Sequence, residues 1–382
     1  MSIEIITRRI SALLQGDKLI WLTVSLLSLV SVLVVYSSSE ALALRRNADG
    51  GSLLVKHVTL LVMGMAVMYG CHMINFMRYA KASTWLLWIA VLLLIYTLLF
   101  GPTINEARRW IFVPFVGITV QTSDFAKVVL VMYTARTIAL MQEKTVSLSE
   151  LVLPVLLVCG LIAPSDLSTS LSMFFTAVLL MFIGRVELRD VFALFMLGLS
   201  LFACLIIMYD YFPASIRVDT WISRLSDFAT GAGNASADSQ VLQAKMAIAK
   251  GGIFGVGPGN GTQAHFLPHA YSDYIFCIVI EEYGLFGAIA VIGLYLLLLI
   301  RCIRLVTRSP KTFGAMLAIG LCFSIITQAF IHMAVNVNLV PVTGLTLPFL
   351  SMGGTSLMFS GIAMGMILSV SKYVETVGSE PH

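Results

Sequence analysis

Hydrophobic residues along this chain are gathered into ten long runs that short polar stretches separate. The runs are Leu19–Ser37, His57–Phe76, Thr84–Phe100, Phe125–Met141, Leu151–Pro164, Ser168–Gly184, Val191–Tyr211, Tyr274–Ile300, Phe313–Val335 and Gly354–Ser371. About 20 apolar residues cross the hydrocarbon core of a bilayer as an α-helix, which satisfies its own backbone hydrogen bonds there. We therefore predict an all-α integral membrane protein with about ten transmembrane helices. The fifth and sixth runs are short and meet at a polar break, Ser165-Asp166.

The composition agrees with this pattern. Of the 382 residues, 58% are hydrophobic and only 12% are charged, about half the share expected of a soluble domain. The mean hydropathy is +0.93, so lipid is expected to solvate most of the exterior. The net charge is +4, and no basic run indicates a nucleic-acid partner. We interpret residues 1–382 as a single polytopic membrane domain.

The distribution of lysine and arginine predicts the orientation. With the N-terminus in the cytoplasm, most of these residues fall in inner segments, where membrane proteins carry their excess of positive charge. An even number of crossings then places residues 1–18 and the tail, residues 372–382, both in the cytoplasm. The first run is too long for a signal peptide, and no small-residue cleavage site follows it cleanly, so we predict a retained helix.

One loop, residues 213–272, is much longer than the others and lies between the seventh and eighth predicted helices, on the outer face. It contains aromatic and hydrophobic residues throughout, which favours an ordered, functional segment over a disordered one. Its glycine-rich stretch, residues 251–261, would let backbone amides approach an anion. It is no nucleotide fingerprint, because no strand precedes it and no Lys-Ser/Thr follows.

Ionisable residues at membrane depth are expensive and are candidates for function. Asp124 and Lys127 are spaced i, i+3 and share a helical face; from spacing alone, a functional pair and an interfacial pair are equally open. Arg109, beside Arg108 and Trp110, could grip a phosphate, although a solvated loop is the commoner outcome. Asp166 could bind a substrate hydroxyl or cap the next helix, and capping is more common.

Two later blocks are also polar where the pattern predicts membrane. Asp273 begins the eighth run, and Glu281 and Glu282 follow about two turns deeper, where they would serve packing through hydrogen bonds or line a cavity. Residues 336–356 carry three glycines, two prolines and many small polar residues between two apolar runs. Irregular backbone at that depth is tolerated only when it is packed in protein or lines a cavity.

Together these blocks resemble the SEDS family, the shape, elongation, division and sporulation proteins typified by FtsW and RodA. The similar segments, in order, are Gln121 to Lys127, Pro164 to Thr169, Gln243 to Asn260, Leu267 to Phe276 and Pro341 to Ser356. The match covers nearly the whole chain, and several motifs in register are more specific than any one. The compact length and short tails are more similar to the division-type FtsW than to the elongation-type RodA.

The sequence departs from the family pattern at a few positions. Asp124 stands where the family usually has Glu, and Thr122 replaces a usual Pro. His269 and Tyr271 replace a usual Glu and His before the essential aspartate, which is Asp273 here. Met352 replaces a usual Tyr.

The resemblance implies a peptidoglycan glycosyltransferase that polymerises lipid II into glycan strands at the outer face of the bacterial cytoplasmic membrane. Such an inverting transfer needs a base for the acceptor hydroxyl and positive charge for the leaving pyrophosphate. The expected base is Asp273. The expected substrate-binding residues are Arg109, Asp124, Lys127, Asp166, Asn260, Thr343, Ser351, Gly353, Gly354 and Ser356. The metal ligands are unknown; a divalent cation, Mg²⁺ or Mn²⁺, is a candidate cofactor.

The expected partners are a class B penicillin-binding protein, which is a transpeptidase, other proteins of the division or elongation complex, and membrane lipid. Three other functions are open: a lipid II flippase, a secondary transporter and a non-catalytic scaffold of the division complex. The transporter is disfavoured because the two halves show no paired interrupted helices.

Overall fold

The computed structural model describes residues 15–46, 50–104, 107–113, 118–209, 218–230, 235–267 and 270–378. Each of the ten predicted runs corresponds to a helix. These helices are α2 (Lys18–Arg46), α3 (Gly50–Met73), α4 (Phe76–Phe100), α5 (Thr122–Gln142), α6 (Ser149–Ile162), α7 (Leu167–Ile183), α8 (Leu188–Tyr209), α11 (Ile275–Arg308), α12 (Thr312–Asn336) and α13 (Thr355–Gly378). The predicted helical membrane class is confirmed.

Within the described residues, six of these helices are long and apolar enough to cross a membrane, namely α2, α3, α4, α11, α12 and α13. Helices α6 and α7 are apolar but shorter. The count of ten crossings stays a prediction. The start of α4 was predicted wrongly at Thr84. It lies at Phe76, because Asn75 caps the helix by accepting a hydrogen bond from the backbone N–H of Met77 (2.9 Å).

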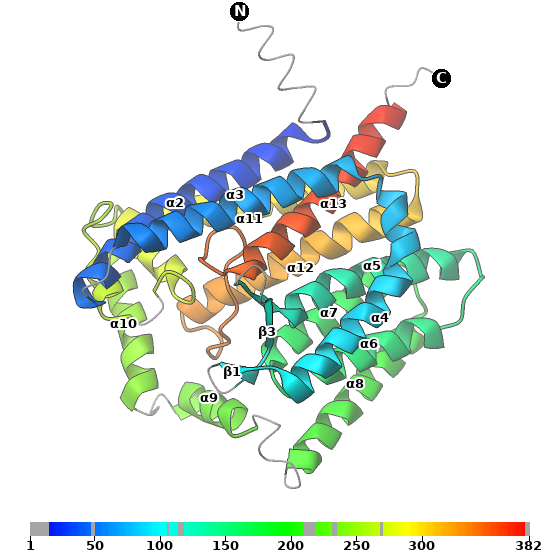
Figure 1. Ribbon diagram of the computed structural model, residues 1–382, viewed down its shortest axis with the longest axis horizontal. Coiled ribbons are helices and arrows are strands. Elements are labelled where there is room, and N and C mark those ends of the chain that lie inside the picture. The colour runs from blue at the N-terminus through cyan, green and yellow to red at the C-terminus, as the bar shows by residue number, and fades with distance from the viewer. Residues whose placement is uncertain are drawn as a thin grey trace, which may run out of the picture.

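The helices form two groups around a central pair (Figure 1). Helices α12 and α13 lie in the middle, with α2, α3 and α11 on one side and α4 to α8 on the other. Helix α12 contacts α5, α7, α11 and α13 and is buried along most of its length. Large hydrophobic side chains such as Trp85, Leu92 and Phe192 are exposed on the periphery, where lipid would solvate them.

Helices α3 and α13 pack at the distance that small residues allow. A Cβ on Gly361 would lie 2.4 Å from the carbonyl oxygen of Gly64, and one on Gly365 would lie 2.3 Å from that of Met68. Membrane helices without a hydrophobic driving force between them associate through such close backbone approaches.

The described chain ends lie side by side. The backbone N–H of Gly16 donates to Glu375 (3.1 Å), and that of Asp17 donates to the Ser371 hydroxyl (2.8 Å). Figure 1 shows the start of α2 and the end of α13 at the same end of the molecule, away from α9 and the short strands. That this end is cytoplasmic stays a prediction.

The described residues outside the ten helices form further helices and strands in two regions. The predicted long loop contains α9 (Val218–Thr230), α10 (Ala235–Gly251) and a 3-10 turn at Gln263–His265, and α10 packs on α11. Its place on the outer face stays a prediction. The connection from α4 to α5 forms two antiparallel pairs, β1 (Thr103–Ile104) with β2 (Ala107–Arg108) and β3 (Trp110–Val113) with β4 (Ile118–Gln121). The hydrophobic pattern did not predict these strands.

Candidate active site

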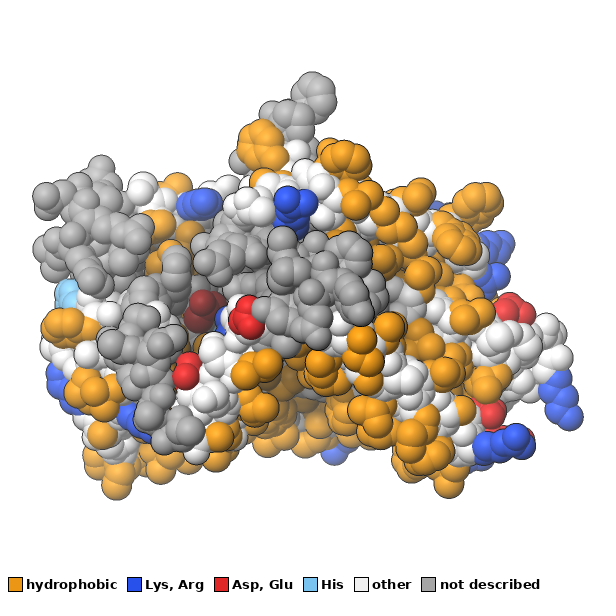
Figure 2. Space-filling view, turned by 90° about the horizontal axis from the view of Figure 1, so that it is seen from below, with side chains coloured by type: hydrophobic (Ala, Val, Ile, Leu, Met, Phe, Trp, Pro, Cys, Tyr) orange, Lys and Arg blue, Asp and Glu red, His pale blue; other side chains and the backbone are white. Residues whose placement is uncertain are grey.

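Four of the charged residues singled out in the sequence, Arg109, Asp124, Asp166 and Asp273, line one pocket of about 550 Å³. Figure 2 shows a recess with acidic side chains at its edge and in its depth, on the face that carries α9 and the short strands. The lining residues are Lys56, Leu60, Arg109, Trp110, Thr119, Gln121, Asp124, Asp166, Thr169, Arg224, Tyr271, Ser272, Asp273, Gln328, Thr343, Gly344, Leu345, Thr346, Met352, Gly353, Gly354, Thr355 and Ser356. They come from α3, the connection between α4 and α5 with its strands β3 and β4, the helices α5, α7, α9, α12 and α13, and the segments before α11 and α13.

An arginine–aspartate pair forms one wall. Arg109, between β2 and β3, donates from Nη1 to Asp166 Oδ2 (3.0 Å) and from Nε to the carbonyl of Ser165 (2.9 Å). Asp166 caps α7, the commoner of its two alternatives, by accepting hydrogen bonds from the N–H and hydroxyl of Thr169. Capping and pocket lining are therefore combined in one carboxylate, which also orients the Arg109 guanidinium.

A second ion pair lies behind this wall, on α5. Lys127 Nζ lies 3.4 Å from Asp124 Oδ1, and both side chains are largely buried, so the predicted pairing is confirmed. Lys127 also donates to Gln328 Oε1 on α12 (2.6 Å). Asp124 faces the pocket, whereas the described lining does not include Lys127. Its charge acts on this pocket through Asp124 rather than by direct exposure.

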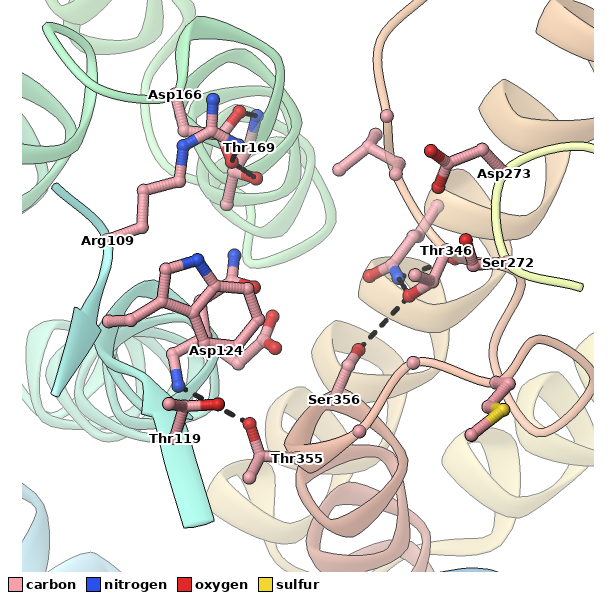
Figure 3. Close-up of a pocket in the computed structure, with 18 of the residues that line it drawn as sticks. Arg109, Thr119, Asp124, Asp166, Thr169, Ser272, Asp273, Thr346, Thr355 and Ser356 are labelled. Atoms are coloured by element: carbon pink, nitrogen blue, oxygen red, sulfur yellow. Dashed lines mark hydrogen bonds and ion pairs between the residues drawn. The ribbon is translucent and has the colours of Figure 1, made fainter. Parts of the chain in front are cut away.

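The opposite wall carries Asp273, just before α11. Tyr274, not Asp273, is the N-cap residue of α11, and the Tyr274 side chain makes no cap hydrogen bond. Figure 3 shows the Asp273 carboxylate across the pocket from the Arg109–Asp166 pair, with its oxygens toward the space between them. A substrate between these walls would have a carboxylate on one side and a guanidinium on the other.

The segment before α13 completes this wall with small side chains and backbone. Thr346 and Ser356 hydroxyls are 3.2 Å apart (Figure 3), and Gln328 Nε2 donates to the Thr346 carbonyl (2.8 Å). Gly354 has a positive φ of 57° where the chain turns into α13. The irregular backbone predicted from residues 336–356 therefore lines a cavity.

Eight of the eleven predicted site residues line the pocket. They are Arg109, Asp124, Asp166, Asp273, Thr343, Gly353, Gly354 and Ser356. Lys127, Ser351 and Asn260 are not among its lining residues. The Ser351 hydroxyl donates to the Ser272 carbonyl and accepts from Leu347 N–H, while Asn260 is exposed and donates to the Val256 carbonyl (3.2 Å).

The glycine-rich stretch and the two residues after it bring amides to anions, but these anions are carboxylates of the protein itself. Glu281 is fully buried and accepts hydrogen bonds from the N–H groups of Thr262 (2.8 Å) and Gln263 (3.2 Å). The neighbouring Glu282 accepts from Gly259 N–H (3.3 Å) and from the Ser37 hydroxyl. Of the two interpretations of these carboxylates, packing through hydrogen bonds is the one observed.

Among the lining residues that the sequence reasoning missed are three long polar or charged side chains: Lys56 on α3, Arg224 on α9 and Gln328 on α12. Arg224 donates from Nη1 to the Val342 carbonyl (3.0 Å), which joins α9 to the wall opposite Arg109. The signal for Arg224 was its place in an amphipathic stretch within an aromatic-rich loop. Nothing local distinguished Gln328 from the other residues of an apolar run.

The pocket also permits a divalent cation. No cluster of three or more His, Cys, Asp and Glu side chains occurs in the described part of the chain. Mg²⁺, however, is commonly held by one or two carboxylates together with substrate phosphates. Asp124 and Asp166 both line the pocket, and Asp124 Oδ2 is buried with no hydrogen-bond partner among the described residues. These residues fit such an ion.

Fold and site together define a multi-pass helical membrane protein with a polar, charged pocket among its helices. A model of the cell cycle protein family that comprises FtsW, RodA and SpoVE matches residues 17–376. The chain belongs to this family, the one that the sequence motifs resemble.

Individual relatives agree. The chain is 30% identical over 380 residues to the "Probable peptidoglycan glycosyltransferase FtsW" of Trichlorobacter lovleyi, covering 96% of each chain. It is 32% identical to the protein of the same name from Geobacter metallireducens, covering 93% of this chain and 94% of that one. It is 29% identical to the "Stage V sporulation protein E" of Bacillus subtilis, covering 94% and 97%.

Two solved structures share the fold. One, from work on "Structural coordination of polymerization and crosslinking by a peptidoglycan synthase complex", has a TM-score of 0.70 at 22% identity and covers 93% of this chain and 97% of its own. The other, the rod shape determining protein RodA of Thermus thermophilus, has a TM-score of 0.68 at 22% identity and covers 93% and 96%. The likeness extends over almost the whole membrane fold.

Proposed function

We propose that this protein is a peptidoglycan glycosyltransferase that polymerises lipid II at the outer face of the bacterial cytoplasmic membrane, with Asp273 as the general base. The observation that carries the proposal is the pocket in which Asp273 faces the Arg109–Asp166 pair. The names of the full-length relatives, "Probable peptidoglycan glycosyltransferase FtsW", support the same activity.

The chemistry follows from these groups. The acceptor sugar hydroxyl attacks the anomeric carbon of the donor, the new C–O bond forms as the bond to the pyrophosphate oxygen breaks, and the configuration inverts. Asp273 takes the hydroxyl proton, and the pyrophosphate leaves with the electron pair of the broken bond. Arg109 offers charge-assisted hydrogen bonds to the leaving group, and Asp166 keeps its guanidinium oriented.

The other pocket residues have supporting roles in this proposal. Thr343, Gly353, Gly354 and Ser356 offer a small, polar surface against which a sugar can pack. Asp124 and Asp166 would hold a Mg²⁺ or Mn²⁺ ion, which supplies positive charge for the pyrophosphate when it is bound. The lipid tail reaches the pocket from the bilayer, because the pocket lies among membrane helices.

Purified protein with labelled lipid II tests the proposal. Glycan polymer in detergent or liposomes is the expected product. Movement of intact lipid II across liposomes without polymer would identify a flippase instead, and neither polymer nor movement would indicate a scaffold. The measurement is made with and without the transpeptidase, so that a requirement for the partner is not mistaken for inactivity.

A further inference from the structure

The backbone of Asp273 is held by residues that lie far along the chain. The carbonyl of Asp273 accepts a hydrogen bond from Asn336 Nδ2 (2.9 Å), and the carbonyl of Ser272 accepts one from the Ser351 hydroxyl (2.7 Å). The carbonyl of Tyr271 accepts one from Met352 N–H (3.0 Å). Three consecutive peptide units that lead into α11 are therefore each tied to the segment between residues 336 and 352.

The Asn336 side chain makes two hydrogen bonds to the backbone around the start of α11. It is 1% exposed at the end of α12, and its Oδ1 accepts from Cys277 N–H (3.1 Å) while its Nδ2 faces the Asp273 carbonyl. If the amide oxygen and nitrogen of Asn336 were exchanged, the oxygen would face the Asp273 carbonyl and the NH₂ group would face Cys277 N–H. Neither pair could form a hydrogen bond, so the network determines the orientation of the amide.

The hydrogen bond to Cys277 adds a side-chain acceptor at the start of α11, where Cys277 N–H also donates to the Tyr274 carbonyl (3.1 Å). The first N–H groups of a helix have no partner within the helix, and a cap residue normally satisfies one of them. Tyr274 makes no side-chain cap bond, so Asn336 caps α11 from the neighbouring helix. The same side chain fixes the residue in front of the cap, Asp273.

The Ser351 hydroxyl also holds the backbone in front of α11. It is 2% exposed, and its hydroxyl both donates to the Ser272 carbonyl and accepts from Leu347 N–H (2.9 Å). A hydroxyl has one proton to donate, and Ser351 donates it to the Ser272 carbonyl, so it is not available to a ligand.

We propose that Asn336 and Ser351 are positioning residues, which hold the Asp273 carboxylate in place through the backbone and do not touch substrate. This inference rests on the proposed function, since it assigns these residues to the base of that reaction. Loss of either bond frees the peptide units that carry Asp273. A displacement of about 1 Å at a reacting group costs about 10²-fold in rate.

Alanine substitutions measure the effect. Asn336→Ala and Ser351→Ala are each expected to lower kcat for lipid II polymerisation about 10- to 100-fold and to leave KM close to wild type. The matched control is Ser369→Ala. Its hydroxyl is also buried and donates to a carbonyl of another segment, that of Ile74. It lies about four turns along α13 from the pocket, so it should alter stability but not kcat.

A double-mutant cycle separates positioning from general support of the fold. Asp273→Glu moves the carboxylate by one methylene and should cost less rate in a Ser351→Ala background, where the backbone can adjust, than in the wild type. Additive losses, an unchanged kcat, or a rise in KM with a melting temperature far below that of Ser369→Ala would each overturn the inference. If the wild-type protein makes no glycan in the same assay, the result contradicts the proposed function itself rather than the roles of Asn336 and Ser351.

Discussion

The three acidic side chains that line the pocket differ in their structural roles. Asp166 caps α7 and pairs with Arg109, and Asp124 pairs with Lys127 on its own helix. Asp273 stands one residue outside the N-cap of α11 and lines the pocket. Asparagine keeps the size of this side chain and removes its charge, so chemistry and folding can be tested apart at this position.

We expect Asp273→Asn to fold, reach the membrane and bind lipid II, yet to polymerise about 10²–10⁴-fold more slowly, because an amide cannot accept the proton. The measurement is the initial rate of glycan formation beside lipid II binding and melting temperature. Asp190→Asn, in the first turn of α8 and outside the pocket, is the control and should polymerise normally. A near wild-type rate for the Asp273 variant would move the base elsewhere, with Asp166 next to test.

Lys127 and Asp124 are expected to matter more for stability than for contact with substrate. Lys127→Ala leaves a buried carboxylate without its cation and also removes the donor to Gln328 Oε1. Breaking a buried pair costs about 3–5 kcal/mol in the free energy of unfolding, whereas replacing both charges together is often nearly neutral.

The comparison is therefore Lys127→Ala against the double variant Asp124→Asn with Lys127→Met, by denaturation in detergent and by polymerisation rate. The double variant should unfold at a higher denaturant concentration than the single one, and the single variant should also polymerise more slowly than wild type. Wild-type stability and rate in Lys127→Ala would show that the pair contributes nothing.

At the scale of elements, the glycine-rich stretch and α11 fit backbone to backbone. Gly284 has φ of 64° and ψ of −159° inside α11, and a Cβ there would lie 2.3 Å from the Ile253 carbonyl oxygen. That conformation is essentially restricted to glycine. The resulting break in α11 is where Leu285 N–H reaches the Gly252 carbonyl (3.0 Å).

Gly284→Ala should accordingly lower the free energy of unfolding by about 1–3 kcal/mol or more, through backbone strain and overlap. Gly293, on the same helix, would meet nothing within 4 Å of an added Cβ. Gly293→Ala should be neutral or stabilising by up to about 1 kcal/mol. Equal melting temperatures for the two variants would contradict the close packing of these segments.

The elements differ in how far the sequence could predict them. The ten helices were predictable because a long apolar run in lipid must satisfy its backbone hydrogen bonds within itself, and an α-helix does so. The pairs β1–β2 and β3–β4 were not, since two to four residues carry no readable period. The i, i+3 pair on α5 follows from helix geometry alone.

The site was predictable only in part, for a related reason. Arg109, Asp124, Asp166 and Asp273 were found because charge is conspicuous in an apolar chain, whereas Lys56 and Arg224 were missed. Arg109 and Asp166 are 57 residues apart, and only the tertiary fold shows that they pair. The same holds for Asn336, Gln328 and Arg224, whose roles depend on which helix each one faces.

For the whole molecule, α13 relates the pocket to the chain ends. It begins at pocket-lining Thr355 and runs 24 residues, about 36 Å, past Ser371, to which Asp17 donates. This length exceeds the roughly 30 Å hydrocarbon core. The pocket and the described chain ends therefore lie at opposite ends of a membrane-length helix.

With both termini in the cytoplasm, as the lysine and arginine distribution predicts, the pocket opens outward. A fluorescent protein fused after residue 382 should fluoresce, and alkaline phosphatase at the same place should be inactive. Phosphatase fused after Tyr209, at the end of the seventh predicted crossing, should be active. The reverse pattern of activities would invert the orientation and would place the pocket on the wrong side for polymerising exported lipid II.

A polymerase whose glycan must then be cross-linked gains from a transpeptidase held nearby, because tethering raises the effective concentration of the second active site. The periphery offers exposed apolar side chains, such as Leu92 and Leu99 on α4 and Phe192 and Phe195 on α8, to a single membrane helix. We expect a complex with a class B penicillin-binding protein to be captured by cross-linking in native membranes and to survive purification in mild detergent.

A fluorescent penicillin identifies the captured protein by its covalent label, and an equally tagged, unrelated multi-pass protein controls for non-specific recovery. Repeated purification that yields active polymerase and no penicillin-labelled band would mean that the enzyme works alone.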